Sequence, residues 1–406
     1  MMLPSQAFDV LPASGPQRGL WLSQQLRSAA KDYVICEAYE LRGRIDLDAL
    51  RGAFDRLLAR HSALRTGVCQ LDDELVRFTV PPVPGFLRVV SGDPAEVIAA
   101  VAAEPFDLAR PPLMRAVAVI AGPERTVLVL CFHHVAVDET SIAILCAAIG
   151  QYYIAALAGE TEVEHEVARQ TRPVSREVVL ARCAELASAP AVVNLPAGTQ
   201  DGSVELVVPR AELEPLLAVA RDLGVTRCAA MLGAAGVALA RLTGQDDLII
   251  ALAVSTRDEL TADAVGMFVN MVPLRLVNLA TADRRELLLQ AGFAVLQGLA
   301  AAGVPFEELV AALPEVRRPG RMPLAQVSFS YWELESAERD LGLPGVSSSR
   351  LPAPAITTEF ELALGCVLRP DDVILSAEWK GHAFDGRRGP ALIQDVLRTA
   401  QRLGGG

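Results

Sequence analysis

Two adjacent histidines, followed after three apolar residues by an aspartate, are the side chains of this sequence best suited to carry out chemistry. They lie in the stretch His133-His134-Val135-Ala136-Val137-Asp138, directly after an apolar run that begins at Val127. An imidazole takes up or releases a proton near neutral pH, and it needs partners for its ring nitrogens when it is buried. The pattern therefore predicts a site that handles protons.

A strand and a helix must position these residues. The run from Val127 to Phe132 is rich in β-branched residues and has the length of a strand, and the uncharged segment 141–159 predicts a helix that Asp138 would cap. The segment is long enough to span a bilayer, but it contains glycine, glutamine and two tyrosines, which favours a buried core helix. Side chains alternate along a strand, so His133 and His134 should have different roles, and we expect a structural hydrogen-bonding role for His133.

Strands and helices alternate along the rest of the chain, which predicts an α/β fold with mixed sheets flanked by helices. Further strands are predicted at 33–41, 64–68, 113–120, 204–208, 248–254, 269–277, 326–332, 361–368 and 373–379. Further helices are predicted at 11–26, 47–58, 94–103, 211–223, 226–242, 283–302 and 389–403. The 406 residues exceed a usual single core, and a second succession starts near Arg172-Pro173. We therefore expect two domains, 1–172 and 173–406.

Composition and charge narrow the class of partner. The net charge is −12 without any block rich in lysine or arginine, which argues against nucleic acid and anionic membranes as partners. The seven cysteines are scattered singly along the sequence. We therefore expect them to be small buried hydrophobic residues of a cytoplasmic protein. The N-terminus lacks the pattern of a signal peptide. No further histidine lies near the motif, so no metal site is expected.

Five further motifs accompany the histidine motif along nearly the whole chain. They are Ser14-x-x-Gln17-x-x-Leu20-Trp21, Arg60-His61-Ser62-Ala63-Leu64-Arg65-Thr66, Val265-Gly266-Met267-Phe268-Val269-Asn270 with Arg275 five residues on, Val304-Pro305-Phe306-Glu307, and Arg321-Met322-Pro323-Leu324. Together, and in this order, the six motifs resemble those of condensation domains of nonribosomal peptide synthetases, within the chloramphenicol-acetyltransferase-like superfamily. The central family motif ends in glycine, whereas this sequence has Glu139.

The resemblance implies a fold and an activity. The fold would be a pseudo-dimer of two acetyltransferase-like lobes in a V shape, monomeric as a protein, with a central tunnel. Donor and acceptor peptidyl carrier proteins would deliver substrates on phosphopantetheine arms, and an acceptor amine would attack the donor thioester to form an amide in peptide antibiotic biosynthesis. No bound cofactor is required, because the thioester stores the driving force and the protein needs only to align the reactants and move one proton.

Roles for the motif residues follow from this chemistry and from the resemblance. The attacking ammonium must lose a proton, so His134 is the expected general base or the group that positions the amine. The resemblance suggests that Asp138 forms an ion pair with Arg65, which would hold the histidine loop in shape. Glu139 would narrow the acceptor channel or add a carboxylate to it. An oxyanion could be bound by a backbone N–H at the start of the helix after Asp138.

Other candidates lie further along the chain. Asn270, Arg275, Ser328 and Ser330 are candidates for lining the tunnel, although backbone carbonyls could equally satisfy Asn270 and Arg275, and the serines could face solvent. Arg317, Arg318 and Arg321 form the densest basic cluster and are candidates for docking an acidic carrier protein, the alternative being a solvated loop.

Two other functional classes remain open. A free-standing acyltransferase could use acyl-CoA, or a carrier-bound acyl group, with a small amine or alcohol as acceptor. Alternatively, the departures from the family pattern, Glu139 among them, could mark a catalytically impaired module that docks carrier proteins.

Overall fold

The computed structural model describes residues 3–4, 6–26, 33–160, 175–314, 318, 321–334, 340–354 and 358–405. The chain divides into two compact units. Unit 1 consists of Met1–Thr171, Arg257–Phe268 and Glu338–Thr357, and unit 2 consists of Arg172–Thr256, Val269–Ala337 and Thr358–Gly406. The first junction agrees with the expected division near residue 172, but two later stretches of chain belong to unit 1, so a single division does not describe the chain.

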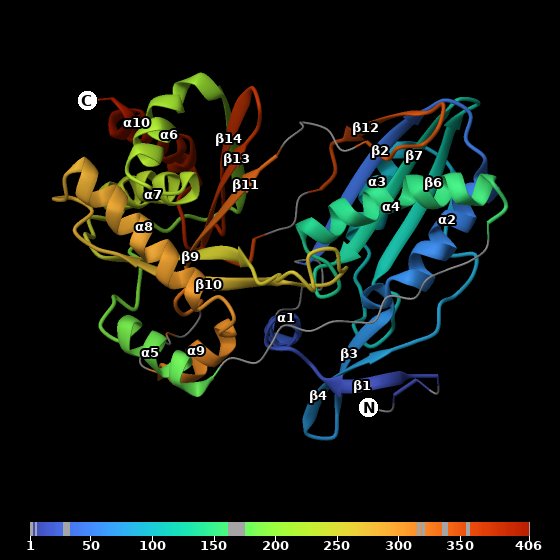
Figure 1. Ribbon diagram of the computed structural model, residues 1–406, viewed down its shortest axis with the longest axis horizontal. Coiled ribbons are helices and arrows are strands. Elements are labelled where there is room, and N and C mark those ends of the chain that lie inside the picture. Colours follow the sequence, from blue (N-terminus) through green and yellow to red (C-terminus); the bar gives the residue numbers. More distant parts are fainter. Residues whose placement is uncertain are drawn as a thin grey trace. The chain divides into compact units, whose positions relative to one another are not determined.

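Unit 1 contains a five-stranded sheet that carries the histidine motif (Figure 1). Its strand order is β12 (Ser347–Leu351), β2 (Val34–Arg42), β7 (Arg125–His133), β6 (Met114–Gly122) and β5 (Arg88–Ser91), antiparallel except for β5 and β6. A second, three-stranded sheet has the order β1 (Phe8–Pro12), β4 (Glu74–Thr79) and β3 (Thr66–Leu71). The helices of the unit are α1 (Gly15–Leu26), α2 (Leu47–Arg60), α3 (Pro94–Ala103) and α4 (Glu139–Leu157).

The core of unit 1 lies around β7. Every residue of this strand from Thr126 to His133 is buried, which explains its nearly continuous apolar sequence. Helix α4 is long and apolar enough, by length and composition, to cross a membrane. It packs against α2 and buries Ile142, Leu145 and Ile149 in the same core as the strand, so we interpret it as a core helix.

Unit 2 contains a six-stranded mixed sheet. Its order is β10 (Val269–Leu276), β9 (Leu248–Ser255), β11 (Val327–Glu333), β13 (Leu362–Leu368), β14 (Asp372–Trp379) and β8 (Gly202–Pro209). Strand β11 runs parallel to both of its neighbours, and the other pairs are antiparallel. The helices of the unit are α5 (Arg176–Leu186), α6 (Glu214–Asp222), α7 (Arg227–Thr243), α8 (Arg284–Ala300), α9 (Phe306–Ala312) and α10 (Gly389–Gly404).

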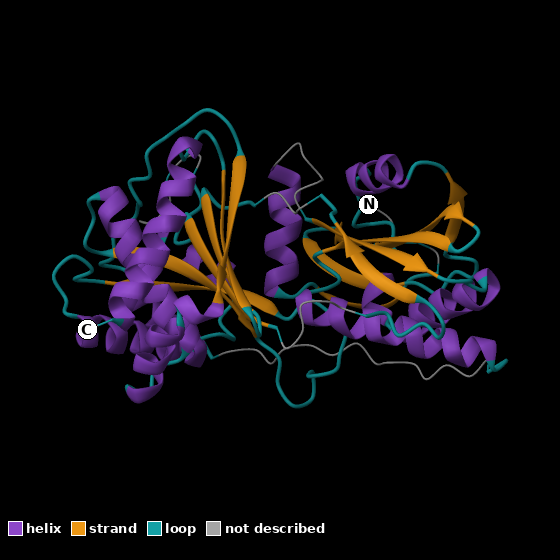
Figure 2. Ribbon diagram, turned by 90° about the horizontal axis from the view of Figure 1, so that it is seen from above, coloured by secondary structure: helices purple, strands orange, loops and turns teal. Residues whose placement is uncertain are grey.

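Alternating burial shows how this second sheet is covered. Along β13 the buried residues are Leu362, Leu364, Cys366 and Leu368, and the residues between them are half-buried. The buried face joins one apolar core with α7, α8 and α10. Figure 2 shows helices covering one side of this sheet. Helices α6 and α7 together pass the same membrane test as a bent pair, but α7 is buried along most of its length within this core.

Candidate active site

The end of β7 and the start of α4 place the two histidines and Asp138. The strand ends at His133, a short turn carries His134, and Asp138 is the N-cap residue of α4, where its Oδ1 accepts a hydrogen bond from the Ser141 N–H at 2.7 Å. This bond stabilises the helix start, as expected for an aspartate cap. It also occupies the Ser141 N–H, which is therefore not available to an oxyanion.

His134 is held in one tautomer by the turn that follows it. Its Nδ1 lies 2.8 Å from the carbonyl oxygen of Val137, and because a carbonyl oxygen can only accept, Nδ1 carries the proton. The other nitrogen, Nε2, then keeps its lone pair. The side chain is half-buried. This arrangement provides a proton acceptor on a ring whose orientation is set by a backbone contact.

His133 is placed for a different role. Its side chain is fully buried, and its Nδ1 accepts a hydrogen bond from the Val135 N–H at 3.1 Å. The rings of Tyr33 and Phe106 pack against the imidazole ring of His133, the first tilted and the second edge-on, each at a centroid distance of 6.0 Å. Burial, together with the nearby charges of His134 and Arg115, lowers the pKa of His133 to about 3. This imidazole is therefore neutral and serves the packing of the turn.

A buried ion pair joins Asp138 to Arg257, a residue of the chain segment Arg257–Phe268. The Nη2 of Arg257 lies 2.8 Å from the Asp138 Oδ1, and the Asp138 Oδ2 accepts from the Phe268 N–H at 3.1 Å. Both charged side chains are buried, at 9% and 2% exposure. The Arg257 guanidinium also lies over the Phe268 ring, 4.4 Å from its centroid. Asp138 therefore holds the segment Arg257–Phe268 in place and also caps the start of α4.

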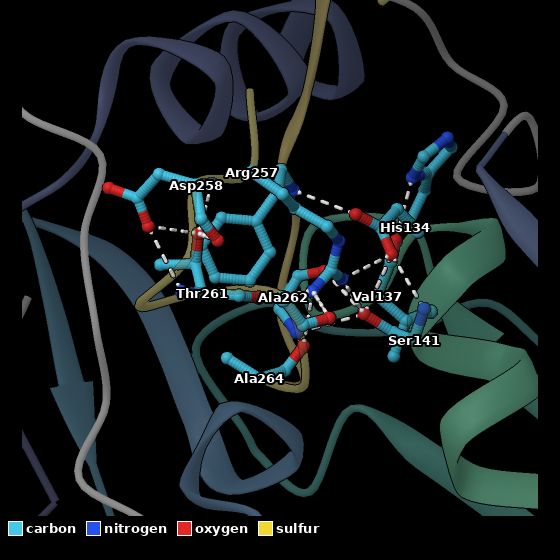
Figure 3. A network of polar contacts seen from close by, with 11 residues as sticks. His134, Val137, Ser141, Arg257, Asp258, Thr261, Ala262 and Ala264 are labelled. Carbon is cyan, nitrogen blue, oxygen red and sulfur yellow. Dashed lines mark hydrogen bonds and ion pairs between the residues drawn. The ribbon is translucent and has the colours of Figure 1, made fainter. Parts of the chain in front are cut away.

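Backbone carbonyls and Ser141 complete the network (Figure 3). The Arg257 Nη1 donates to the carbonyl oxygens of Thr261 at 2.7 Å and Ala264 at 2.6 Å, and its Nη2 donates to the Ser141 Oγ at 2.8 Å. The Ser141 hydroxyl accepts from the Gly266 N–H at 3.0 Å and lies 2.8 Å from the Gly266 oxygen. The turn that presents His134 is thus braced by one charged pair and one hydroxyl.

The expected pair between Asp138 and Arg65 is wrong. The buried Arg65 side chain donates to the carbonyl oxygens of Leu58 at 2.7 Å, Ala59 at 3.2 Å and Val80. Burial lowers the pKa of this guanidinium. Arg65 therefore satisfies the carbonyl groups at the end of α2, and Arg257 takes the place at Asp138. The sequence signal that could have located it is an arginine three residues after the strand 248–254, ahead of the Gly266 motif.

The other motif residues of unit 1 have local structural roles. Ser14 and Gln17 form a reciprocal capping box at the start of α1, in which each side chain accepts from the other residue's N–H, at 3.3 and 3.0 Å. His61 is the buried C-cap residue of α2. Glu139 is the first residue of α4 and is half-buried, so its carboxylate interacts favourably with the positive end of the helix dipole.

Two of the four candidates for lining a tunnel are occupied within unit 2. The buried Asn270 donates to the carbonyl oxygens of Ala302 and Val304 and accepts from the Phe306 N–H. Arg275 makes a bidentate ion pair with Asp247 at 3.0 and 2.7 Å. The alternative of satisfaction by backbone carbonyls therefore holds for Asn270, whereas Arg275 is satisfied mainly by the Asp247 carboxylate, and a tunnel-lining role for either residue stays a prediction.

For Ser328 and Ser330 the predicted role in lining a tunnel stays a prediction. Ser328 and Ser330 lie on β11 with the buried Phe329 between them, so they share the sheet face opposite to that residue. Ser328 is buried, whereas Ser330 is half-buried and lies 3.5 Å from the carbonyl oxygen of Leu364. Their contact with a substrate remains a prediction.

The basic cluster expected to dock carrier proteins is only partly described. Arg317 lies outside the described residues, and Arg318 is exposed. Arg321 forms an ion pair with the buried Glu361 at 3.1 Å, so part of its charge is used within unit 2. Within the described part of the chain, no three His, Cys, Asp or Glu side chains are grouped in a way that could hold a metal ion.

Comparisons with known proteins identify the family of the chain. The sequence matches the family model described as the condensation domain over residues 8–169 and 182–401. It is 30% identical to the cyclosporin synthetase of Tolypocladium inflatum, over 92% of this chain and 3% of that protein. It is 28% identical to surfactin synthase subunit 2 of Bacillus subtilis, over 96% of this chain and 11% of that protein. The chain thus spans a small part of these relatives.

Solved structures support the fold. The X-domain from teicoplanin biosynthesis superposes with a TM-score of 0.85 at 22% identity, covering 100% of this chain and 96% of that chain. The first condensation domain of the calcium-dependent antibiotic synthetase superposes with a TM-score of 0.75 at 19% identity, covering 97% and 96%. These matches confirm the expected two-lobed α/β fold.

Proposed function

The chain belongs to the condensation-domain family, and from this premise we propose that it joins a carrier-bound acyl or peptidyl thioester to an acceptor amine in nonribosomal peptide biosynthesis. Condensation domains of such synthetases work with carrier protein domains, whose phosphopantetheine arms tether the substrates. We propose donor and acceptor peptidyl carrier proteins as the partners of this chain, and no cofactor bound to the chain itself.

The observation that carries this proposal is the hydrogen bond between the His134 Nδ1 and the Val137 oxygen, because it leaves Nε2 as a proton acceptor. In the proposed reaction the amine nitrogen bonds to the thioester carbonyl carbon, and the carbon–sulfur bond breaks. The amine attacks as the free base, after its ammonium form has released one proton to solvent. Once the nitrogen is bonded and positively charged, His134 Nε2 accepts a second proton from it and passes that proton to the departing thiolate. One imidazole can therefore serve both proton transfers.

A substitution of His134 by asparagine tests this role. The asparagine amide can still donate to the Val137 oxygen, in place of Nδ1, but it has no counterpart of Nε2. We expect His134→Asn to fold with a melting temperature close to that of the wild type and to lose about 10²-fold or more in amide formation. The assay uses donor and acceptor carrier proteins loaded with aminoacyl thioesters, and detects the amide by mass spectrometry.

The same assay separates the proposal from the two alternatives. Product from acyl-CoA in the absence of any carrier protein would favour the free-standing acyltransferase. Tight binding of a carrier protein without product from any donor and acceptor pair would favour a docking module. Full amide formation by His134→Asn would remove the imidazole from the mechanism, whichever donor is used.

We also propose that Glu139 selects the acceptor, since it stands at the start of α4, five residues after His134. Replacing it by glycine removes the whole side chain, which consists of three carbons and the two carboxylate oxygens. If residue 139 limits the acceptor, Glu139→Gly should raise turnover with bulky or anionic acceptor amines more than with glycine as the acceptor. Equal turnover for all acceptors would assign Glu139 to helix stability alone.

For carrier docking, Arg318 and Arg321 are both exposed, and Arg321 is also paired with Glu361. We propose that an acidic carrier protein contacts Arg318. Arg318→Glu should then weaken carrier binding in a salt-dependent manner, whereas Arg110→Glu, another exposed arginine, should not. Unchanged carrier affinity after Arg318→Glu would rule out this docking site.

A further inference from the structure

Two cysteines face each other on the central strands of the five-stranded sheet of unit 1. Cys36 of β2 and Cys131 of β7 are directly paired in the antiparallel register, and their sulfur atoms lie 3.2 Å apart, with the Cys131 thiol donating to Cys36. The pair occupies the same sheet face as His133, which lies two residues beyond Cys131 and opposite Val34. The two thiols are therefore part of the strand that carries the histidine motif.

The surrounding sheet holds the two thiols in place. On its other side Cys131 of β7 is paired with Arg115 of β6, whereas the pairing of β2 with β12 covers Ala38–Arg42 and does not reach Cys36. A disulfide requires the sulfur atoms to approach to about 2.05 Å. Because the two residues are direct partners across neighbouring strands, this approach requires rotation of the side chains and little movement of the backbone.

We propose that Cys36 and Cys131 form a thiol oxidation site that takes a hydroperoxide as its oxidant and closes to a disulfide. Cys36 is the expected point of attack, because its exposure is 7% whereas Cys131 is fully buried. The hydrogen bond from Cys131 also lowers the pKa of the Cys36 thiol, and it raises the pKa of the Cys131 thiol together with burial. The greater exposure and the lowered pKa both favour Cys36 as the thiol that the oxidant attacks.

The reaction has two steps. In the first, the Cys36 sulfur bonds to one oxygen of the peroxide, the oxygen–oxygen bond breaks, and the thiol proton leaves with the second oxygen as water, or as an alcohol from an alkyl hydroperoxide. In the second, the Cys131 sulfur displaces the hydroxyl group from Cys36 and releases water. With hydrogen peroxide, two thiols and one oxidant yield one disulfide and two waters, a two-electron oxidation.

The disulfide would cross-link two strands that are far apart in the sequence. A covalent link between residues 36 and 131 restricts the unfolded chain, so the oxidised protein should unfold at a higher temperature than the reduced protein. The link lies two residue pairs along the strand ladder from the pair of Val34 and His133. Oxidation would therefore stiffen the strands that support the catalytic turn.

Peptide mapping of the folded full-length chain tests the proposal. The protein is treated with one equivalent of hydrogen peroxide, alkylated, digested without reduction and analysed by mass spectrometry. We expect a linked pair of peptides containing Cys36 and Cys131, and a rise in melting temperature that dithiothreitol reverses. The wild-type result alone decides the matter: if both cysteines stay fully alkylated while the half-exposed Cys228 is oxidised, the proposal is wrong.

Single variants test the order of the steps. In Cys131→Ser, the sulfenic acid has no resolving thiol, and dimedone should label Cys36, whereas in Cys36→Ser dimedone should leave Cys131 unlabelled. Cys69→Ser is the matched control, because Cys69 is also a buried strand cysteine of unit 1, and this variant should still form the link. Labelling of Cys131 in Cys36→Ser would overturn the assignment of Cys36 as the point of attack. None of these measurements depends on amide formation.

Discussion

Arg257 and Asp138 form a buried ion pair although they are 119 residues apart in the sequence, with the Arg257 Nη2 2.8 Å from the Asp138 Oδ1. Asp138 also caps α4, and Arg257 also bonds the carbonyl oxygens of its own segment. One charged contact therefore connects the helix after the turn that carries His134 to the segment Arg257–Phe268. The expected role of such a pair is to specify one conformation of the turn.

Removal of Arg257 should destabilise the protein strongly. Arg257→Ala leaves the Asp138 carboxylate buried without its charged partner, and the expected loss in the free energy of unfolding is about 3–5 kcal/mol. Chemical denaturation measures this loss. The control is Arg110→Ala, which removes an exposed ion pair with Asp107 and should cost less than about 1 kcal/mol. Similar losses for both variants would contradict the role assigned to Arg257.

His133 should make stability depend on pH. Its pKa is about 3 in the folded protein and 6.5 ordinarily, so above pH 6.5 the ring is neutral in both states and contributes no pH dependence. Between pH 6.5 and pH 3 the unfolded chain binds a proton that the folded protein does not, and the free energy of unfolding falls as the pH falls. The slope from this residue is about 1.4 kcal/mol per pH unit.

Other groups also titrate in this range, so the measurement compares two proteins. His133→Asn retains an acceptor for the Val135 N–H but does not titrate. The difference in unfolding free energy between the wild type and this variant should shrink as the pH falls below 6.5. A difference that stays constant with pH would show that the imidazole is not kept neutral by its burial.

Two helix glycines should respond in opposite ways to alanine. A Cβ at Gly150 of α4 would lie 2.1 Å from the carbonyl oxygen of Leu341. Gly150→Ala therefore requires α4 and the backbone at Leu341 to move apart and should destabilise unit 1. A Cβ at Gly52 of α2 would meet only the Ala156 Cβ at 3.4 Å. Gly52→Ala should therefore raise stability by about 0.5–1 kcal/mol through helix propensity. Thermal unfolding compares the two, and a stabilising Gly150→Ala would contradict the close approach.

Asn270 should be essential to the connection between α8 and α9. Its amide satisfies the carbonyl oxygens of Ala302 at 2.8 Å and Val304 at 2.6 Å, and its oxygen accepts from the Phe306 N–H at 3.3 Å. Asn270→Ala leaves these groups without a partner and should cost about 2–4 kcal/mol.

The aspartate variant and an exposed asparagine provide the controls for this prediction. Asn270→Asp should be at least as harmful as alanine, because a carboxylate cannot donate to two carbonyl oxygens. Asn194→Ala, at an exposed position, should change stability by less than about 0.5 kcal/mol. Both are measured by urea denaturation. If Asn270→Asp were as stable as the wild type, the amide would not be the donor in these bonds.

Much of the secondary structure is predictable from the sequence, because helix periodicity, strand alternation and capping residues act over a few neighbours. The expected helices 94–103 and 226–242 agree closely with Pro94–Ala103 and Arg227–Thr243, and the expected strand 248–254 lies within Leu248–Ser255. Two edge strands, β1 and β12, were missed. Leu11 and Pro12 belong to β1 and not to the following helix. All residues of β1 are exposed and those of β12 are only partly buried, so neither strand shows the alternation of apolar and polar residues that predicts a strand.

The sequence by itself determined the motif order, the strand that leads to His133 and the capping aspartate at 138, since all of these depend on residues close together in the chain. Only the tertiary structure decided that Arg257, and not Arg65, is the partner of Asp138, and that Cys36 lies beside Cys131. The physical reason is that a charged group or a thiol could pair with any of several residues, and the sequence does not show which of them it will meet. Which partner it meets depends on how distant segments pack when they bury their apolar surface, and no local pattern records that choice.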